Sequence, residues 1–483
     1  MLATFAHRNQ GSVNDLPIHR STDGGLTWSS SPISTITSHT SGWDLEAPVL
    51  YEVPRTANGL NAGDLLAAGT AWQAGDYTTQ KTEVFKSTDH GVTWQYLSDC
   101  TSTSGLPNSI GHGIREPWFL LAENNTLACF ISDERPAGSS TNNQVIGHYT
   151  STDGGLTWSS SLTEDVAFPS DNLARPGMST IVSLPDGNFM MAYELCRDAT
   201  DADHACEVYI KTSPDGLDWS PTAGAGTLVQ TSDGRHLLHT PYLSWQSGGG
   251  SHGTLLISGQ RVTTGTTGSE TVMAESGTVV LSNTSLGSGE WTEIEAPVET
   301  SPTGGYDSGE PSCPGYSSPI NPLADGTSFL YLSATWTGTG NQCEVRFGIG
   351  RLGGRVGRVT TPWISGKCLD VDSNLNTDGN AVQLWDCNEA TGQRWSVAAD
   401  GTLRAFGKCL DIDANATADF SKVQLWECNG SGGQQWQHQS NGALYNPQSG
   451  RCLDIPSGAT ANGTQLQIYD CNNLDTQNWN LPT

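Results

Sequence analysis

Short apolar runs alternate with turns rich in Gly, Asp, Ser and Pro along the first three quarters of the chain. Examples are GDLLAAG, NTLACFIS, NFMMAYE, TLLISGQ and SFLYLSATW. Runs of this length between turn residues are typical of β-strands. An extended segment precedes the runs, beginning at Leu45, Ile114, Arg175, His239 and Gly315. The pattern predicts about four short strands in each unit of about 65 residues, as in the blades of a β-propeller.

A recurring turn marks these units. STDGGLTW at Ser21–Trp28 returns as STDHGVTW at Ser87–Trp94 and STDGGLTW at Ser151–Trp158, with looser copies at Thr212–Trp219 and Ser282–Trp291. Such recurrence indicates a repeat architecture. Ser and Asp side chains can bond the amides of a tight turn, and Gly adopts a backbone angle that other residues resist. We expect each copy to be a hairpin turn that stabilises its blade away from any chemistry. Counting a truncated first unit and a last unit without this turn gives six blades over residues 1–360.

The pattern changes near Thr361, where three units each begin with Cys-Leu-Asp after a basic residue and end in Gln-x-Trp. Two cysteines lie 19 residues apart in each unit, as Cys368/Cys387, Cys409/Cys428 and Cys452/Cys471. The three units resemble the ricin-B type carbohydrate-binding module, which implies a β-trefoil over residues 361–483. The predicted fold class is all-β, a six-bladed β-propeller followed by a C-terminal β-trefoil with negligible helix. The junction RLGGRVGRVTTPW is short, so we expect the two domains to lie close together.

The net charge and the cysteine content limit the classes of ligand and the compartment that fit this protein. The 483 residues carry a net charge of −28, which disfavours binding to nucleic acid or anionic lipid but not to a neutral polymer. No apolar run is long enough to span a membrane. The other six cysteines suggest the pairs Cys100/Cys129, Cys196/Cys206 and Cys313/Cys343, without the C-x-x-C spacing of a zinc site. We expect disulfides and a secreted, monomeric protein. Because MLATFAHRNQ lacks the features of a signal peptide, we expect a targeting segment and one strand upstream of this chain.

Each trefoil unit offers an acid, an aromatic residue and an amide at equivalent positions. The three sets are Asp370, Trp385 and Asn388; Asp411, Trp426 and Asn429; and Asp454, Tyr469 and Asn472. A carboxylate and an amide can bond neighbouring hydroxyls of a sugar while its apolar face lies on the aromatic ring. The resemblance implies that these positions bind sugar, and the alternative is that one or more of them are purely structural. The Gln and Trp of each Gln-x-Trp are expected in the core.

Four acids stand near the starts or ends of predicted inner strands, namely Glu46, Glu116, Glu194 and Glu310. Glycoside hydrolysis needs two carboxyl groups, one protonated to assist the leaving group and one ionised. A Glu at the end of an apolar strand, such as Glu194 in NFMMAYE, is placed where desolvation can raise its pKa. For any one of these acids alone, a salt bridge or a turn contact is the simpler explanation.

FAHRN, IREPWFL and ARPGMSTIVSLPDGNFMMAYE resemble the exo-acting arabinanases of glycoside hydrolase family 93. The resemblance covers about Leu2 to Val359 and departs from the family in long loops such as Thr263–Gly268. It implies that Glu116 is the acid/base and Glu194 the nucleophile. It also implies cleavage of α-1,5-linked arabinan from a chain end with retention, so the expected partner is a plant cell-wall polysaccharide. No metal or other cofactor is expected.

Two other functions stay open. GYSSPINPLADG also looks like the sialidase segment that supplies a nucleophilic Tyr, which would be Tyr316 here, assisted by Glu194 or Glu310. A sialidase needs three Arg to bind the substrate carboxylate, and Arg8, Arg261 and Arg346 are the available set, although no F-R-I-P type strand surrounds Arg8. The third possibility is a non-catalytic, lectin-like adhesin, which the paired acids of the propeller disfavour.

Overall fold

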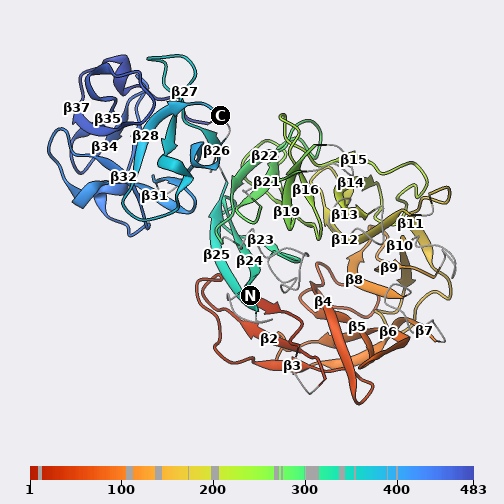
Figure 1. Cartoon of the computed structure of the whole chain (residues 1–483). Coiled ribbons are helices and arrows are strands. Elements are labelled where there is room, and N and C mark those ends of the chain that lie inside the picture. Colours follow the sequence, from red (N-terminus) through yellow and green to blue (C-terminus); the bar gives the residue numbers. More distant parts are fainter. Residues whose placement is uncertain are drawn as a thin grey trace.

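The computed structural model shows a ring of β-sheets followed by a separate C-terminal lobe (Figure 1). It describes residues 1–8, 13–104, 113–135, 144–171, 173–196, 206–265, 271–273, 276–298, 300, 315–336, 343–352, 355–388, 390–398 and 401–482. In these ranges the regular structure is strand, apart from short 3-10 turns in the C-terminal lobe. The all-β prediction is therefore confirmed. None of the described segments forms a helix of the length and hydrophobicity needed to cross a membrane.

The first half of the ring consists of three consecutive antiparallel meanders. The first is β1 (Leu2–Thr4), β2 (Leu16–Arg20) and β3 (Ser34–Ile36). The second is β4 (Trp43–Glu52), β5 (Leu65–Gln73), β6 (Asp76–Ser87) and β7 (Gln95–Thr103). The third is β8 (Ile114–Leu121), β9 (Leu127–Asp133), β10 (Val145–Ser151) and β11 (Thr163–Val166).

The second half of the ring is less regular. Its first sheet is β12 (Arg175–Ser183), β13 (Phe189–Cys196), β14 (Glu207–Ser213) and β15 (Thr227–Leu228), extended by β16 (His236–Leu238), β19 (Arg261–Thr264) and β20 (Thr271–Val272). The next is β17 (Tyr242–Gln246), β18 (Thr254–Ser258), β21 (Val279–Asn283) and β22 (Thr292–Glu295). The last is β23 (Ile320–Pro322), β24 (Ser328–Trp336) and β25 (Cys343–Arg351). The described strands up to Arg351 thus fall into six sheets, but the six-blade count stays a prediction because one sheet takes in three extra strands.

The repeated turn has the structure expected from its sequence. In the first copy, Asp23 accepts the amide of Thr27 at 2.9 Å and its hydroxyl at 2.5 Å, while the hydroxyl of Ser21 accepts the amide of Gly25 at 2.8 Å. The second and third copies repeat these bonds at Asp89 and Asp153. Each copy joins the last two strands of its sheet, as in β2–β3 and β6–β7. The turns therefore act as hairpin connections, as predicted.

The C-terminal lobe is built from three similar units around one core. Its strands are β26 (Arg355–Arg358), β27 (Lys367–Val371), β28 (Asn380–Asp386), β29 (Arg394–Val397), β30 (Leu403–Ala405), β31 (Lys408–Ile412), β32 (Val423–Trp426), β33 (Gln437–His438), β34 (Leu444–Asn446), β35 (Arg451–Asp454), β36 (Thr464–Gln465) and β37 (Gln467–Asp470). Its 3-10 turns are η1 (Asp372–Asn374), η2 (Thr391–Gln393), η3 (Asp413–Asn415), η4 (Gly432–Gln434), η5 (Pro456–Gly458) and η6 (Asp475–Gln477). The Gln-x-Trp tryptophans lie in the core, where Trp395, Trp436 and Trp479 donate to the carbonyls of Leu369, Leu410 and Leu453.

The disulfides follow the predicted pairing wherever both cysteines are described. They are Cys100–Cys129, Cys196–Cys206, Cys368–Cys387, Cys409–Cys428 and Cys452–Cys471. Cys343 is also disulfide-bonded, and its predicted partner Cys313 lies outside the described residues.

The two domains contact each other through β22, as the short junction predicted. Glu293 is buried and pairs with Arg235 of the ring and with Arg394 of the C-terminal lobe. The neighbouring Glu295 accepts the hydroxyl of Ser396 at 2.8 Å. The interface buries charges that pair across it. Separating the domains would remove Arg394 and leave the buried negative charge of Glu293 paired with Arg235 alone.

The turn carboxylates give the fold a defined response to acid. Bonds from the Thr27 hydroxyl and amide hold the pKa of Asp23 at about 2, below the ordinary 3.8, and the pKa of Asp89 is held at about 2 in the same way by Thr93. A lowered pKa stabilises the folded state above the ordinary pKa, and that stability is lost as the pH falls toward the folded value. We expect the double variant Asp23→Asn/Asp89→Asn to melt a few degrees lower at pH 6 and to differ less from the parent at pH 2, as followed by circular dichroism. Asp186→Asn, in an ordinary turn, is the control. A constant difference at both pH values would contradict this explanation.

Candidate active site

The inner strands of neighbouring sheets share a bulge that directs side chains into the middle of the ring. The strand register shifts between Glu46 and Val49 in β4, between Arg115 and Trp118 in β8, and between Gly177 and Thr180 in β12. In each bulge one residue has a left-handed backbone conformation, and residues with the same conformation precede the first strands of the next two sheets. The φ angles are 51° at Ala47, 60° at Glu116, 54° at Met178, 46° at Thr240 and 51° at Ser317. Residues other than Gly rarely adopt this conformation. Bulges re-aim side chains and are enriched beside active sites.

These bulges line a cavity of about 610 Å³. Its lining includes the aromatic residues Trp28, Trp72, Trp118, Tyr242, Tyr316 and Phe347. An apolar, aromatic cavity with a few polar groups is the usual form of a small-molecule site. Trp28 belongs to the first of the repeated turns, so the expectation that all these turns lie away from the chemistry is wrong for this copy.

Glu116 reaches the cavity from the bulge of β8. One of its carboxylate oxygens, Oε2, accepts the hydroxyl of Ser132 at 2.6 Å and the backbone amide of Met178 at 3.0 Å. Ser132 lies on the neighbouring strand β9, whereas Met178 lies in the bulge of β12, in the next sheet. The carboxylate is therefore oriented by two sheets at once.

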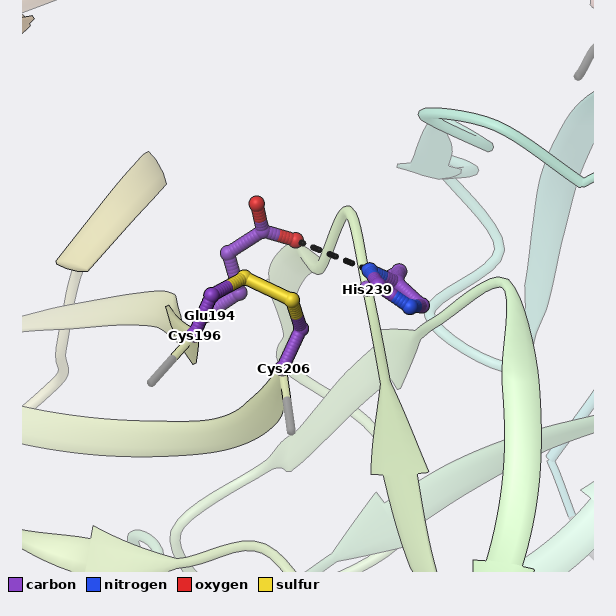
Figure 2. A group of neighbouring side chains, drawn as sticks. All are labelled: Glu194, Cys196, Cys206 and His239. Atoms are coloured by element: carbon purple, nitrogen blue, oxygen red, sulfur yellow. Dashed lines mark ion pairs between the residues drawn. A yellow bond between two sulfur atoms is a disulfide. The ribbon is translucent and has the colours of Figure 1, made fainter. Parts of the chain in front are cut away.

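Glu194 approaches the same region from the end of β13. Its Oε2 accepts the backbone amide of Thr240 at 2.7 Å and lies 3.8 Å from Nδ1 of His239 (Figure 2). Its side chain is 14% exposed, and the cavity wall beside it is formed by the bulge that includes Met178. Burial, together with the negative charge of Glu116, raises the pKa of Glu194 to about 8. The buried position of Glu194 therefore favours its protonated form.

Strand β12 lies between the two carboxyl groups. Gly177 pairs with Glu194 within its own sheet, and the adjacent Met178 binds Glu116 of the preceding sheet. A Cβ atom at Gly177 would lie 2.7 Å from Nε2 of Gln144 and 3.4 Å from Oε2 of Glu116. A side chain at Gly177 would therefore displace Gln144 and crowd the carboxylate of Glu116.

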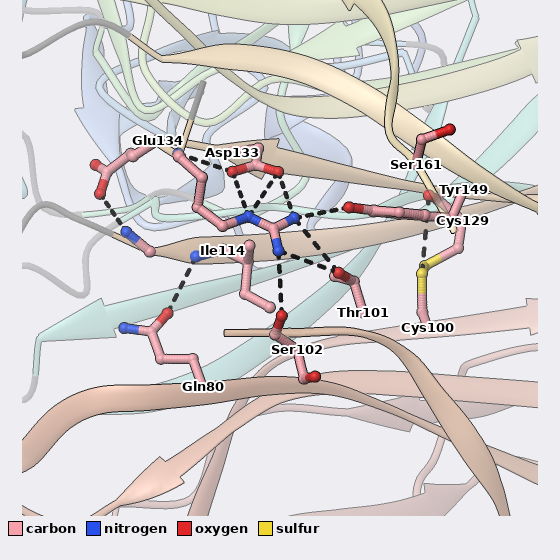
Figure 3. Close-up of polar contacts among 12 residues, drawn as sticks. Gln80, Cys100, Thr101, Ser102, Ile114, Cys129, Asp133, Glu134, Tyr149 and Ser161 are labelled. Atoms are coloured by element: carbon pink, nitrogen blue, oxygen red, sulfur yellow. Dashed lines mark hydrogen bonds and ion pairs between the residues drawn. A yellow bond between two sulfur atoms is a disulfide. The ribbon is translucent and has the colours of Figure 1, made fainter. Parts of the chain in front are cut away.

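Polar contacts around β8, β9 and β12 support this arrangement. The amide of Gly113 binds Glu134 at 2.6 Å, and the amide of Ile114 binds Gln80 of the preceding sheet at 3.1 Å (Figure 3). Glu134 also pairs with Arg175 at the start of β12. Arg175 in turn acts against the raised pKa of Glu194 through its positive charge. The polar network thus links three successive sheets to the acid pair.

One cluster near Glu194 has the composition of a metal site but not its chemistry. Glu194, Cys196, Cys206 and His239 offer donor atoms within 4.8 Å of one another. The two cysteines form a disulfide, so they offer no thiolate, which is the form of Cys that binds metals. Figure 2 shows the disulfide beside the Glu194 carboxyl group. The cluster therefore does not fit a metal ion, and the expectation that the protein needs no metal stays a prediction.

The other acids and the Arg residues predicted from the sequence lie at different places in the structure. Glu46 lines the cavity and binds Arg8 at 2.8 Å and Asn14 at 2.6 Å. Arg8 also lines the cavity, whereas Arg261 on β19 and Arg346, which pairs with Glu344, are not among the lining residues. The three arginines are therefore not brought together. Tyr316 lines the cavity and is 36% exposed, and Glu310 lies outside the described residues, as does part of the Thr263–Gly268 loop.

In the trefoil, the aromatic member of each predicted set lies nearer the surface than the acid. Asp370, Asp411 and Asp454 are each only 5% exposed, and each accepts a Gln side chain from the facing strand, Gln383, Gln424 and Gln467 respectively. Burial raises the pKa of all three acids. Asn388, Asn429 and Asn472 bind amides of their own loops. Trp385 and Tyr469 are half-buried and Trp426 is 38% exposed, so these rings are the accessible part of each set.

Comparison with known proteins supports both halves of this description. Residues 1–233 match the BNR repeat-like domain, and residues 355–479 match the ricin-type β-trefoil lectin domain. Short segments match curated proteins: 49 residues are 43% identical to serine protease 1 of Rarobacter faecitabidus, and 40 residues are 42% identical to nigrin b of Sambucus nigra. The matches span 10% and 8% of this chain but only 9% and 7% of the lengths of those relatives.

The structural neighbours confirm the resemblance to glycoside hydrolase family 93. An α-L-arabinanase of Penicillium chrysogenum in complex with arabinobiose is 26% identical, with a TM-score of 0.58. A family 93 α-L-arabinofuranosidase of Fusarium graminearum, also with arabinobiose, is 25% identical with the same TM-score of 0.58. Each comparison covers 73% of this chain and 89% of the neighbour.

The coupling between the two acids can be measured directly. Because the charge of Glu116 is one cause of the raised pKa of Glu194, Glu116→Gln should lower the pKa of Glu194 below about 8. A 13C titration of the Glu carboxyl signals, assigned by comparison with Glu194→Gln, would report the shift. Glu46→Gln is the matched control, since Glu46 also lines the cavity but is bound to Arg8. An unchanged titration of Glu194 in Glu116→Gln would show that the acids are not coupled.

Proposed function

We propose that this chain is a secreted glycoside hydrolase that removes short products from the ends of α-1,5-linked arabinan with retention of configuration. The observation that carries the proposal is the pair Glu116 and Glu194, two coupled carboxyl groups of which Glu194 has a raised pKa. Retaining glycosidases need such a pair, one acid and one ionised. The similarity to arabinan-active enzymes of family 93 indicates the substrate class.

The fold belongs to the same proposal. The six sheets up to Arg351 are the blades of a six-bladed propeller. The trefoil begins slightly before the expected boundary at residues 360 and 361, because β26 already pairs with β29 and Val359 lies in the trefoil core. The disulfides support an extracellular location.

In the proposed reaction, Glu194 attacks the anomeric carbon and Glu116 protonates the departing glycosidic oxygen. Glu116 then takes a proton from water, which hydrolyses the glycosyl-enzyme intermediate. The carboxyl groups are expected about 5–5.5 Å apart in the substrate complex. Before the attack, the proton of the pair must lie on Glu116 and not on Glu194. Protonation of Glu116 removes the smaller cause of the raised pKa of Glu194, its negative charge, whereas burial, the larger cause, remains.

The cavity suits a chain end. Aromatic rings such as Trp118 and Tyr242, which contact each other edge to face, offer apolar surfaces for sugar rings. The Glu46–Arg8–Asn14 group supplies donors and acceptors for hydroxyl groups. Tyr316, which also lines the cavity, is proposed to contact the substrate.

The alternatives are less well supported. A sialidase would need three arginines around the substrate carboxylate, and only Arg8 of the proposed trio lines the cavity, where it already pairs with Glu46. A purely sugar-binding protein gives no reason for the raised pKa of Glu194 beside Glu116.

The trefoil is proposed to hold the enzyme on polysaccharide through Trp385, Trp426 and Tyr469, with the nearby Asp and Asn residues shaping each site. No cofactor and no partner other than the polysaccharide is proposed.

Product analysis tests the substrate class. We expect incubation with linear α-1,5-arabinan to release arabinose or arabinobiose from the first minutes, without the intermediate lengths of internal cleavage. Anion-exchange chromatography separates these products, and sialyl-lactose in a parallel incubation should remain intact. Glu194→Gln, purified in the same way, controls for contaminating hydrolases. Release of sialic acid alone would refute the proposal in favour of the sialidase.

Leaving-group dependence tests the two roles. Glu116→Ala should lower kcat on arabinan by on the order of 10²–10⁴ but change the first step on an activated aryl arabinofuranoside much less, because a good leaving group needs no proton. Azide should then yield an arabinosyl azide of retained configuration. Glu194→Ala should abolish turnover of both substrates, and azide should yield the inverted product, which NMR distinguishes. Exchanged behaviour of the two variants would reverse the assignment.

A further inference from the structure

The three trefoil repeats differ at one surface position. In each repeat the aromatic residue faces a residue of another repeat, and the pairs are Trp426 with Gly379, Trp385 with Gly463, and Tyr469 with Phe420. An added Cβ at Gly379 would lie 3.8 Å from the Trp426 ring, and one at Gly463 would lie 3.8 Å from the Trp385 ring. In the third pair, the Phe420 ring already stands with its centroid 5.1 Å from that of Tyr469.

Phe420 occupies a backbone conformation that suits glycine. The φ angles are 82° at Gly379, 81° at Gly463 and 70° at Phe420. A bulky residue at such an angle is a clear outlier, and strained residues of this kind cluster at ligand sites. Two bonds hold the conformation, since the Phe420 amide donates to Ile468 and the amide of Asp470 donates to Asp419, both at 2.9 Å.

Packing gives no reason for a phenylalanine there. The side chain is 63% exposed, so it buries little apolar surface in exchange for the strain. The Phe420 and Tyr469 rings are inclined at 56°, which makes a concave aromatic corner. In the other two repeats the glycine leaves the Trp face open along that side.

A second difference lies beside the same corner. Lys422 follows Phe420 by two residues, where the equivalent residues of the other repeats are Ala381 and Gln465. Its Nζ lies 3.5 Å from Oε1 of Gln467, whose Nε2 binds Asp454 at 3.0 Å. Lys422 thus places hydrogen-bond donors for sugar hydroxyls next to the rings.

We propose that Phe420 and Tyr469, with Lys422, form a subsite that binds the terminal sugar residue of a chain or branch. The Phe420 ring stands as a wall where the other repeats are open, so a chain lying on Tyr469 cannot continue past it. Trp385 and Trp426, with glycine beside them, accept interior stretches. This assignment rests on the proposed sugar-binding function of the trefoil.

The test uses the full chain with Glu194→Gln, so that the ligand is not hydrolysed. Trp385→Ala and Trp426→Ala then leave the third subsite as the remaining aromatic site of the trefoil, and the same chain with Tyr469→Ala added gives the binding by the catalytic cavity, which is subtracted. We expect calorimetry to show tighter binding to short α-1,5-arabino-oligosaccharides than to linear arabinan at equal sugar mass, since the polymer offers fewer ends. Adding Phe420→Gly should weaken binding of the oligosaccharide by about tenfold, the scale of one aromatic contact. The melting temperature should stay the same or rise, because glycine relieves the strain. Leu375→Ala, at an exposed residue of the first repeat, is the control and should change neither.

The other outcomes distinguish a failure of the sugar-binding function proposed for the trefoil from a failure of the role assigned to Phe420. If the Glu194→Gln chain with all three aromatic residues binds neither ligand more tightly than the chain in which all three are alanine, the function proposed for the trefoil fails and this assignment with it. If that chain binds but Phe420→Gly leaves the affinity of the third subsite unchanged, only the assignment is overturned. A fall in melting temperature with unchanged affinity would make Phe420 a structural residue. Tighter binding to the polymer than to the oligosaccharide would refute the selection of chain ends.

Discussion

The hydrogen bonds from bulge amides to carboxylates in the preceding sheet are the constraint on which the site depends. The amide of Met178 donates to Glu116, and the amide of Thr240 donates to Glu194. Both donor residues have a left-handed backbone conformation. The same pattern continues where Ser317 donates to the hydroxyl of Thr240 at 3.2 Å. A ring of sheets can thus fix acids relative to one another, because backbone amides of one sheet donate to carboxylates of the preceding sheet. The repeated turns at the other ends of the strands stabilise the sheets that carry these bulges.

This constraint also explains the electrostatics. Burial and the negative charge of Glu116 raise the pKa of Glu194 to about 8. Arg175 acts in the opposite direction, and its contact with Glu134 connects it to the neighbouring sheet. Glu46, by contrast, is held by Arg8 and Asn14.

Local sequence patterns predicted much of the fold but only part of the site. The repeated turns, the paired cysteines and the Gln-x-Trp core depend on short-range chemistry, so STDGGLTW and the three cysteine units were enough to predict them. Ser132 and the amides of Met178 and Thr240 could not be predicted, because their contacts depend on how a bulge in one sheet meets the next. The burial of Asp370, Asp411 and Asp454 could likewise not be predicted, since the sequence does not distinguish a carboxylate that binds sugar from one that binds a Gln side chain. Phe420 gave a usable signal, because it replaces a glycine of the two other repeats.

The central claim is that Glu194 and Glu116 form a nucleophile and acid/base pair that acts on arabinofuranosides. Trapping with 2-deoxy-2-fluoro-α-L-arabinofuranosyl fluoride, followed by peptide mass spectrometry, tests it most directly, since the fluorine slows hydrolysis of the covalent intermediate. We expect one fluoroarabinosyl group per chain, attached to Glu194 and absent in Glu194→Gln. Attachment to Glu116 or Tyr316, or turnover of the reagent without any covalent adduct, would contradict the account.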